Sequence, residues 1–136
     1  MLEDVKLKDA LRVTMAFSSA CNTYWQATAP WVLFKSDKKR CEQVVNIATQ
    51  ALNLLCAQLE PFMPSFSAKI YEQLNLERTE LHAKLYEHIK EHPERIRNLI
   101  PAGHQIGTPA PIFKEITPEQ AAGWKERFGG VKAGAE

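Results

Sequence analysis

The sequence predicts an all-α protein, a bundle of four or five helices. Apolar residues recur at helical spacing over two long stretches, residues 3–28 and 36–60, and neither stretch contains Gly or Pro. No segment shows a convincing strand pattern. The chain has 136 residues, of which 45% are hydrophobic and 24% charged, as is ordinary for one folded domain. We expect that domain to cover residues 1–130 and a short tail to cover residues 131–136.

Charge and composition exclude several classes of protein. The formal net charge is +1, so a polybasic nucleic-acid coat is excluded and any RNA binding must come from a local patch. The longest apolar runs are far shorter than the ~20 residues of a membrane span, which predicts no membrane partner. The three cysteines, Cys21, Cys41 and Cys56, form no CxxC pair and are odd in number. They predict a reducing intracellular compartment, and we expect a cytoplasmic protein.

The first predicted helix covers residues 3–28. Its polar residues fall on one narrow arc, so the apolar face is wide and we expect it to be packed on more than one side. Pro30 stops this helix, and Ala29 is pushed away from helical geometry by the proline that follows it. Residues 30–34 are predicted to form an apolar connector.

The second predicted helix begins after Ser36, a suitable N-cap, and runs to about Glu60. One side carries a core-facing apolar stripe, and residues 43–59 contain no charge. The uncharged opposite face indicates either burial in a central bundle helix, which we favour, or contact with a polar partner. Its residues are Gln43, Asn46, Thr49, Gln50 and Asn53.

The remaining elements are shorter. Pro64 begins a third helix, and a weaker helical segment covers residues 80–92. Residues 101–113 are rich in Pro and Gly and must be irregular. The sequence Thr-Pro-Glu-Gln at 117–120 predicts a capping box at the start of a last helix, which the glycines at 129–130 end.

Few residues are candidates for chemistry. His88 and His92 are four apart and could hold a metal with a third ligand, although a solvated helix face is the favoured interpretation. That third ligand would be His82, Glu87 or Glu91. No nucleophile–base arrangement and no phosphate-binding glycine loop is present. We therefore predict no catalytic residue and no metal site.

Trp31 and the cations that follow it predict a binding surface. Lys35, Lys38, Lys39 and Arg40 lie within ten residues of it, and we call these four residues the basic cluster. An aromatic ring beside cations suits an unpaired base, because the ring stacks on the base while the cations bind phosphates. The alternative is that Trp31 is a hydrophobic staple for the second helix.

Several motifs then resemble one family. The sequence Asn-Thr-Tyr-Trp-Gln-Ala-Thr-Ala-Pro-Trp at 22–31 resembles the N-x-Y-x5-P-W signature of the anticodon-binding domain of methionyl-tRNA synthetases, which are class I enzymes. Residues 7–12 resemble the helix that leads into it, and residues 59–64 resemble the L-x-P-x-x-P corner that follows. Residues 101–113, with Gly-His-Gln-Ile-Gly, are similar to the closing segment of the eukaryotic cytosolic type, and residues 127–130 fit its end.

The resemblance implies a helical module that reads the CAU anticodon of methionine tRNA. By position, Trp31 matches the tryptophan that stacks on an anticodon base, and Pro30 fixes its pose. Asn22 and Tyr24 match signature positions that we expect to brace the junction between helix and connector. The basic cluster is expected to face phosphates of the anticodon arm.

The resemblance also implies partners outside this chain. The family places an Asn and an Arg, four apart, on an earlier helix of the domain, and its catalytic domain uses ATP and Mg²⁺ to attach methionine to the tRNA. Neither part is present, so we expect this chain alone to be inactive. The catalytic domain and a multi-synthetase complex are further candidate partners. Residues 75–99 fit the family poorly and are interpreted as a helical insertion. The alternative function is a protein-interaction module of a synthetase complex that does not read RNA.

Overall fold

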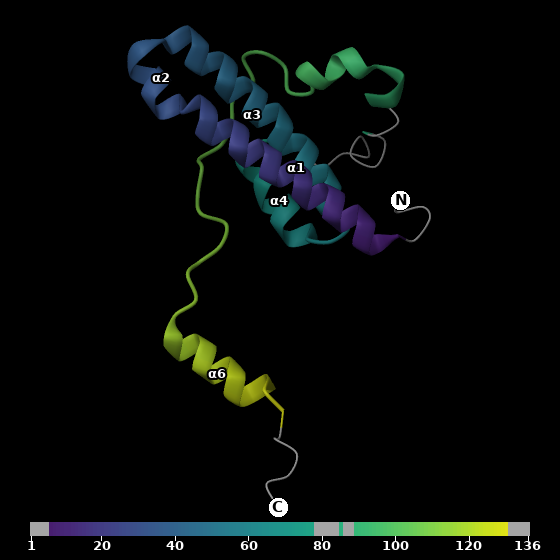
Figure 1. Ribbon diagram of the computed structural model, residues 1–136, viewed down its shortest axis with the longest axis vertical. Coiled ribbons are helices and arrows are strands. Elements are labelled where there is room, and N and C mark those ends of the chain that lie inside the picture. The colour runs from purple at the N-terminus through teal and green to yellow at the C-terminus, as the bar shows by residue number, and fades with distance from the viewer. Residues whose placement is uncertain (1–5, 78–84, 86–88, 131–136) are drawn as a thin grey trace, which may run out of the picture.

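The computed structural model describes residues 6–77, 85 and 89–130. Within those ranges it contains helices and no strand, which confirms the predicted all-α class (Figure 1). No helix in the described part has the length and apolarity to cross a bilayer. The helices are α1 (Leu7–Thr28), α2 (Pro30–Ser36), α3 (Lys38–Leu59), α4 (Pro64–Gln73), the 3-10 helix η1 (Pro93–Arg97) and α6 (Pro118–Phe128).

Helix α3 is the centre of the bundle. Helices α1, α2, α4 and η1 all pack against it, and α1 and α3 lie side by side along most of their length (Figure 1). The buried cluster between α3 and α4 contains Cys56, Ile70, Tyr71, Leu74 and Ile100. The interpretation of the second predicted helix as a central bundle helix is confirmed.

Helix α1 has one main packing partner. It lies against α3, while Leu7, Val13 and Met15 remain exposed. The expectation of packing on more than one side is therefore not met within the described ranges.

The segment that follows α1 differs from the prediction. Residues 30–34 are not a connector but belong to helix α2, which begins with Pro30 at its first position. Proline suits that position because its fixed φ is helical and the missing N–H would have no helical partner there. The N-cap of α3 is Asp37 rather than the expected Ser36, and its carboxylate accepts a hydrogen bond from the Arg40 N–H at 2.9 Å.

The amide face of α3 is partly buried, as favoured from the sequence. Gln50 and Asn53 are buried, and the Gln50 side chain forms two hydrogen bonds with the backbone of Ile100. Its Nε2 donates to the Ile100 carbonyl at 2.8 Å, and its Oε1 accepts from the Ile100 N–H at 2.9 Å. One side chain thereby pairs both backbone groups of a buried residue fifty positions away.

A second glutamine holds the irregular segment that follows. Gln73, the last residue of α4, donates to the Ala110 carbonyl at 2.9 Å and accepts from the Ala110 N–H at 3.0 Å. The Gly107 N–H donates to the Gln73 carbonyl at 2.8 Å, and His104 Nε2 lies 2.7 Å from the Leu74 carbonyl oxygen. Residues 99–110, which we call the strap, therefore satisfy carbonyl groups at the end of α4 that have no partner within the helix.

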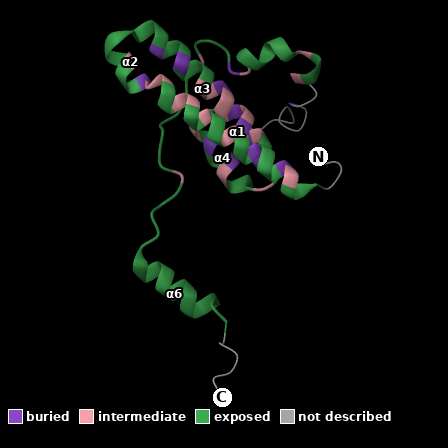
Figure 2. Cartoon of the chain, viewed as in Figure 1, coloured by how far each residue is buried: buried purple, intermediate pink, exposed green. Residues whose placement is uncertain are grey.

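Helix α6 lies apart from the bundle. Its predicted capping box is present, with Gln120 N–H donating to Thr117 Oγ1 at 3.3 Å and Thr117 N–H donating to Gln120 Oε1 at 3.2 Å. The Glu119 carboxylate accepts hydrogen bonds from the Glu119 N–H and from the Thr117 side chain, and these bonds lower the pKa of Glu119. No residue of α6 is buried, and Figure 2 shows the whole helix as exposed.

The predicted segment 80–92 lies largely outside the described residues. Of its described positions, Leu85 and residues 89–91 are helical, and Leu85 is buried. The predicted tail, residues 131–136, also lies outside them. Residues 101–113 are irregular as predicted.

Candidate nucleic-acid interface

A sharp turn between α1 and α2 sets the position of Trp31. Ala29 has left-handed backbone angles, φ 41° and ψ 63°, which confirms that it leaves helical geometry. The Ala29 N–H donates to the Trp25 carbonyl at 3.1 Å, and the Thr28 hydroxyl donates to the Tyr24 carbonyl at 2.8 Å. The last turn of α1 is therefore closed by hydrogen bonds directly before α2 begins.

Pro30 anchors α2 to the bundle. Pro30 is buried, and its carbonyl oxygen accepts a hydrogen bond from the Cys41 thiol at 3.4 Å. The bond joins the first residue of α2 to the first turns of α3. The two residues directly before Trp31 are thus tied by hydrogen bonds, Ala29 to α1 and Pro30 to α3.

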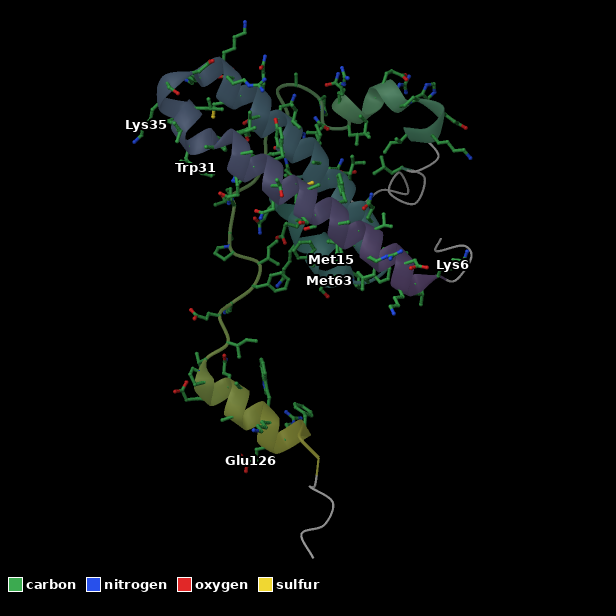
Figure 3. The ribbon with its side chains drawn as sticks, in the orientation of Figure 1. Lys6, Met15, Trp31, Lys35, Met63 and Glu126 are labelled. Carbon is green, nitrogen blue, oxygen red and sulfur yellow. The ribbon has the colours of Figure 1, made fainter. Side chains whose placement is uncertain are left out.

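Trp31 lies in the first turn of α2 and is 52% exposed. Its predicted place on a connector is wrong, because the residue belongs to a helix. Figure 3 shows Trp31 and Lys35 projecting from the outer side of α2. About half of the Trp31 surface therefore remains available for a ligand.

The basic cluster surrounds the corner between α2 and α3. Lys35 lies in the last turn of α2, the other three cations open α3, and all four side chains are exposed. The positive end of the helix dipole disfavours cations in a first turn, each by about 0.3–1 kcal/mol. Helix stability therefore does not explain why Lys38, Lys39 and Arg40 stand there.

The two other signature residues lie on α1. Asn22 is exposed and makes no side-chain hydrogen bond with any described residue, so no bracing of the junction by Asn22 is seen. Tyr24 is half-buried and contributes to the junction through its backbone carbonyl, which accepts the Thr28 hydroxyl. The sequence pattern therefore identified the junction, but the bond at Tyr24 uses the main chain.

A groove of about 600 Å³ continues from the basic cluster between α1, α3 and η1. Its polar rim contains Arg40, Gln43, Asn46 and Arg97, and its apolar side includes Phe17. Arg40 Nη1 donates to Gln43 Oε1 at 3.2 Å. Arg97 was not predicted, because it is far from the cluster in sequence and reaches the groove only where η1 packs against α3.

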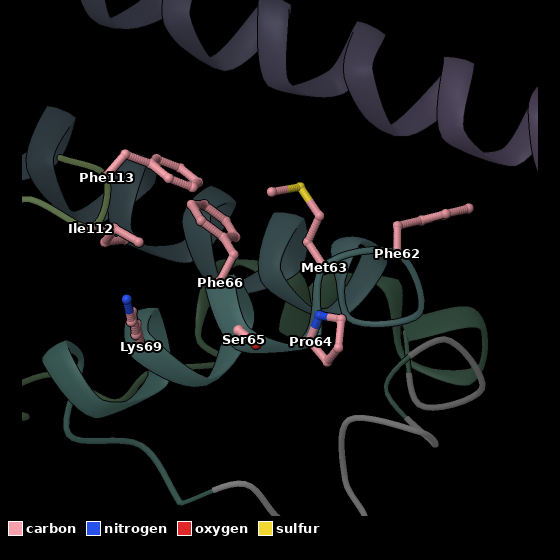
Figure 4. A pocket seen from close by; sticks show the side chains of 8 residues that line it. All are labelled: Phe62, Met63, Pro64, Ser65, Phe66, Lys69, Ile112 and Phe113. Atoms are coloured by element: carbon pink, nitrogen blue, oxygen red, sulfur yellow. The ribbon is translucent and has the colours of Figure 1, made fainter. Parts of the chain in front are cut away.

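A second cavity of about 330 Å³ lies at the corner between α3 and α4 (Figure 4). The rings of Phe66 and Phe113 stack along its edge with centroids 5.6 Å apart and planes 11° from parallel. Among the described residues that line it, Lys69 is the one that carries a charge. The cavity is mainly apolar and contains none of the predicted site residues.

No metal centre forms within the described ranges, where no three His, Cys, Asp or Glu side chains come together. The hypothesis built on His88 is not tested, because His88 lies outside the described residues. His92 Nδ1 lies 3.5 Å from a carboxylate oxygen of Glu94. The three cysteines are free; Cys41 and Cys56 are buried, and Cys21 is half-buried.

Comparison with known proteins gives consistent results. The family model described as the anticodon binding domain of methionyl tRNA ligase matches residues 1–133. The cytoplasmic methionine–tRNA ligase of Arabidopsis thaliana is 41% identical over 97% of this chain and 16% of its own length. The cytoplasmic enzyme of Homo sapiens is 35% identical over 98% of this chain and 14% of its own length. A probable cytoplasmic methionine–tRNA ligase of Dictyostelium discoideum is 37% identical over 96% of this chain and 16% of its own length. The chain thus spans about one-sixth of the length of these relatives.

Proposed function

Because the chain belongs to the family of methionyl-tRNA ligase anticodon-binding domains, we propose that it reads the CAU anticodon of methionine tRNA. The observation that carries the proposal is the half-exposed Trp31, held by the buried Pro30 and followed by the exposed basic cluster. Stacking on such a ring is worth ~1–3 kcal/mol per base.

Each residue has a distinct role in this proposal. Trp31 stacks on an anticodon base, and Pro30 with Cys41 positions it. The basic cluster binds phosphates of the anticodon arm, which also accounts for cations at the unfavourable end of α3. Asn22 and Tyr24 act at the end of α1 that leads to Trp31, where Asn22 offers an exposed amide and the Tyr24 carbonyl closes the junction. The groove rim adds Arg97 as a further phosphate-binding cation.

The remaining parts of the reaction lie elsewhere in the proposed enzyme. We assign ATP, Mg²⁺ and the attachment of methionine to the catalytic part of the ligase, which is also the partner of this domain. The names of the relatives favour the cytoplasm as the place of action.

The experiment that tests the proposal is binding to an RNA stem-loop with a CAU anticodon at low salt. The matched control is the same stem-loop with one anticodon base changed. We expect the CAU loop to bind more tightly, since contacts to bases distinguish one sequence from another, whereas contacts to phosphates only fix the orientation of the RNA. Equal affinity for both loops would reduce the surface to a general phosphate-binding site.

A second candidate function is a protein-interaction module in a synthetase complex. The observation that favours it is α6, which exposes Trp124 and Phe128 and buries no residue. Exposed aromatic side chains on a helix are typical of protein contacts. Capture of protein partners by the chain without any tRNA would support this role over anticodon reading.

A further inference from the structure

Helix α2 exposes a second aromatic ring beside Trp31. Phe34 is 66% exposed, which is a larger fraction than that of Trp31. We propose that Phe34 is a second stacking platform, which takes an unpaired RNA base next to the base on Trp31. This inference rests on the proposed function, because it assigns a second nucleotide to the same surface.

The spacing on α2 places the two rings together. Residues three and four apart on a helix are neighbours, with Cβ atoms about 5–6 Å apart. Phe34 is three residues after Trp31 and Lys35 is four residues after it, so helical spacing places both next to Trp31 on the surface of α2. Leu33 is half-buried and lies on the inner side of α2. The outer side of the helix thus presents two rings and one ammonium group.

The charge around Phe34 favours RNA over protein as the occupant. Lys35, Lys38 and Lys39 are exposed within five residues of the ring, and lysine is depleted at protein–protein interfaces. The acidic residue within that stretch, Asp37, is engaged as the N-cap of α3. Rings interleaved with cations are the arrangement that binds unpaired nucleotides through base stacking and phosphate contacts.

Folding does not require the Phe34 ring. An exposed side chain outside the core contributes little to stability, so its truncation leaves the fold intact and changes binding alone. Val32 is a matched control, because it is 56% exposed and lies on the same helix. It follows Trp31 directly in sequence and therefore does not share its face.

The experiment combines protein variants with abasic RNA. The full chain, and its variants Phe34→Ala, Val32→Ala and Trp31→Ala, are titrated with the CAU stem-loop and with loops that lack one base but keep its phosphate. We expect Phe34→Ala to weaken binding of the intact loop by about 5- to 150-fold, the range for loss of one base stack. Val32→Ala should bind like the wild-type chain. Removal of one particular loop base should weaken RNA binding by the wild-type chain but cause no further loss in Phe34→Ala. Removal of a different loop base should likewise weaken binding by the wild-type chain but cause no further loss in Trp31→Ala.

The outcomes separate the two proposals. Wild-type affinity for Phe34→Ala, together with weak binding by Trp31→Ala, would overturn the second platform and leave anticodon reading in place, with Phe34 assigned to a protein contact. An unchanged abasic profile in Phe34→Ala would also overturn it. Failure of the wild-type chain to distinguish CAU from the altered loop would overturn the proposed function itself, and the second platform with it.

Discussion

The Cys41 thiol lies 3.4 Å from the carbonyl oxygen of Pro30 and donates a hydrogen bond to it. The bond is buried, and it joins the start of α2 to α3 directly beside Trp31. A buried thiol is usually a small apolar core residue, but here its proton also links two helices at the point where the candidate site begins.

Cys41→Ala should therefore affect both stability and binding. We expect a loss of about 1–2 kcal/mol in the free energy of unfolding, since the substitution removes the buried hydrogen bond and leaves space where the sulfur packs. Urea denaturation measures this loss, and titration with the CAU stem-loop should show weaker binding because Trp31 is held less firmly. Cys56→Ala is the control, because Cys56 is also buried but lies far along α3 from Pro30. Equal RNA affinity for the two variants would contradict a positioning role of Cys41.

Gln50→Ala should destabilise the bundle by about 1–3 kcal/mol, because it removes the side chain that pairs with the N–H and carbonyl of the buried Ile100. Gln43→Ala is the matched control on the same helix, where the side chain is exposed and bonds to Arg40. Its effect should stay within about 0.5 kcal/mol. Thermal or urea unfolding compares them, and similar midpoints for both variants would show that the strap is not held through Gln50.

Two glycines offer a second matched pair. A Cβ at Gly107 would lie 3.1 Å from the Gln73 carbonyl oxygen and 3.3 Å from that of Glu72, and both neighbours are backbone atoms. We expect Gly107→Ala to lower stability by about 1–3 kcal/mol through this crowding. Gly123 lies within α6 with open space around its Cα, so Gly123→Ala should instead increase helicity, seen by circular dichroism, and leave the bundle midpoint unchanged. A Gly107→Ala variant as stable as the wild-type chain would show that the strap lies further from α4.

The helices that were predicted correctly carry local sequence signals. Helix α3 has an apolar stripe at helical spacing and a proline beyond its end, and the last helix has a complete capping box. These signals are local, so one sequence is enough to read them. Helix α2 was missed because seven residues of mixed aromatic and branched side chains carry no periodic pattern, although Pro30 at its first position was an available signal.

The contacts that hold the strap were beyond a sequence-based prediction. Gln50 pairs with a backbone fifty residues away, and no local pattern distinguishes it from Gln43 on the same uncharged face. The sequence could propose Trp31 and the basic cluster as one candidate site, because these residues are adjacent in the chain. Arg97 was not found, since only the packing of η1 against α3 brings it to the groove.

Cys56 should make stability depend on alkaline pH. Burial raises the pKa of its thiol to about 12, whereas an exposed thiol ionises at about 8.5. As the pH rises, the unfolded chain therefore loses this proton before the folded chain does. The contribution of the protonated Cys56 thiol to the free energy of unfolding is complete below about pH 8.5 and declines progressively towards pH 12. Urea unfolding from pH 7 to about pH 10.5 should show the free energy of unfolding of the wild-type chain falling relative to that of Cys56→Ala. A constant difference between the two proteins would mean that the Cys56 thiol is open to solvent.

The double variant Lys38→Ala/Lys39→Ala should change stability and RNA binding in opposite directions. Both cations lie at the positive end of the α3 dipole, so their removal should stabilise the helix by about 0.3–1 kcal/mol each. Binding to any RNA stem-loop should weaken, and the slope of log K against log salt should decrease by about 0.7–0.9 for each phosphate that is no longer neutralised. Lys125→Ala is the control for removal of an exposed cation, since Lys125 lies on α6 away from the cluster. A double variant with increased stability and an unchanged salt slope would show that these lysines do not meet phosphates, whereas a reduced slope places the RNA backbone at the start of α3.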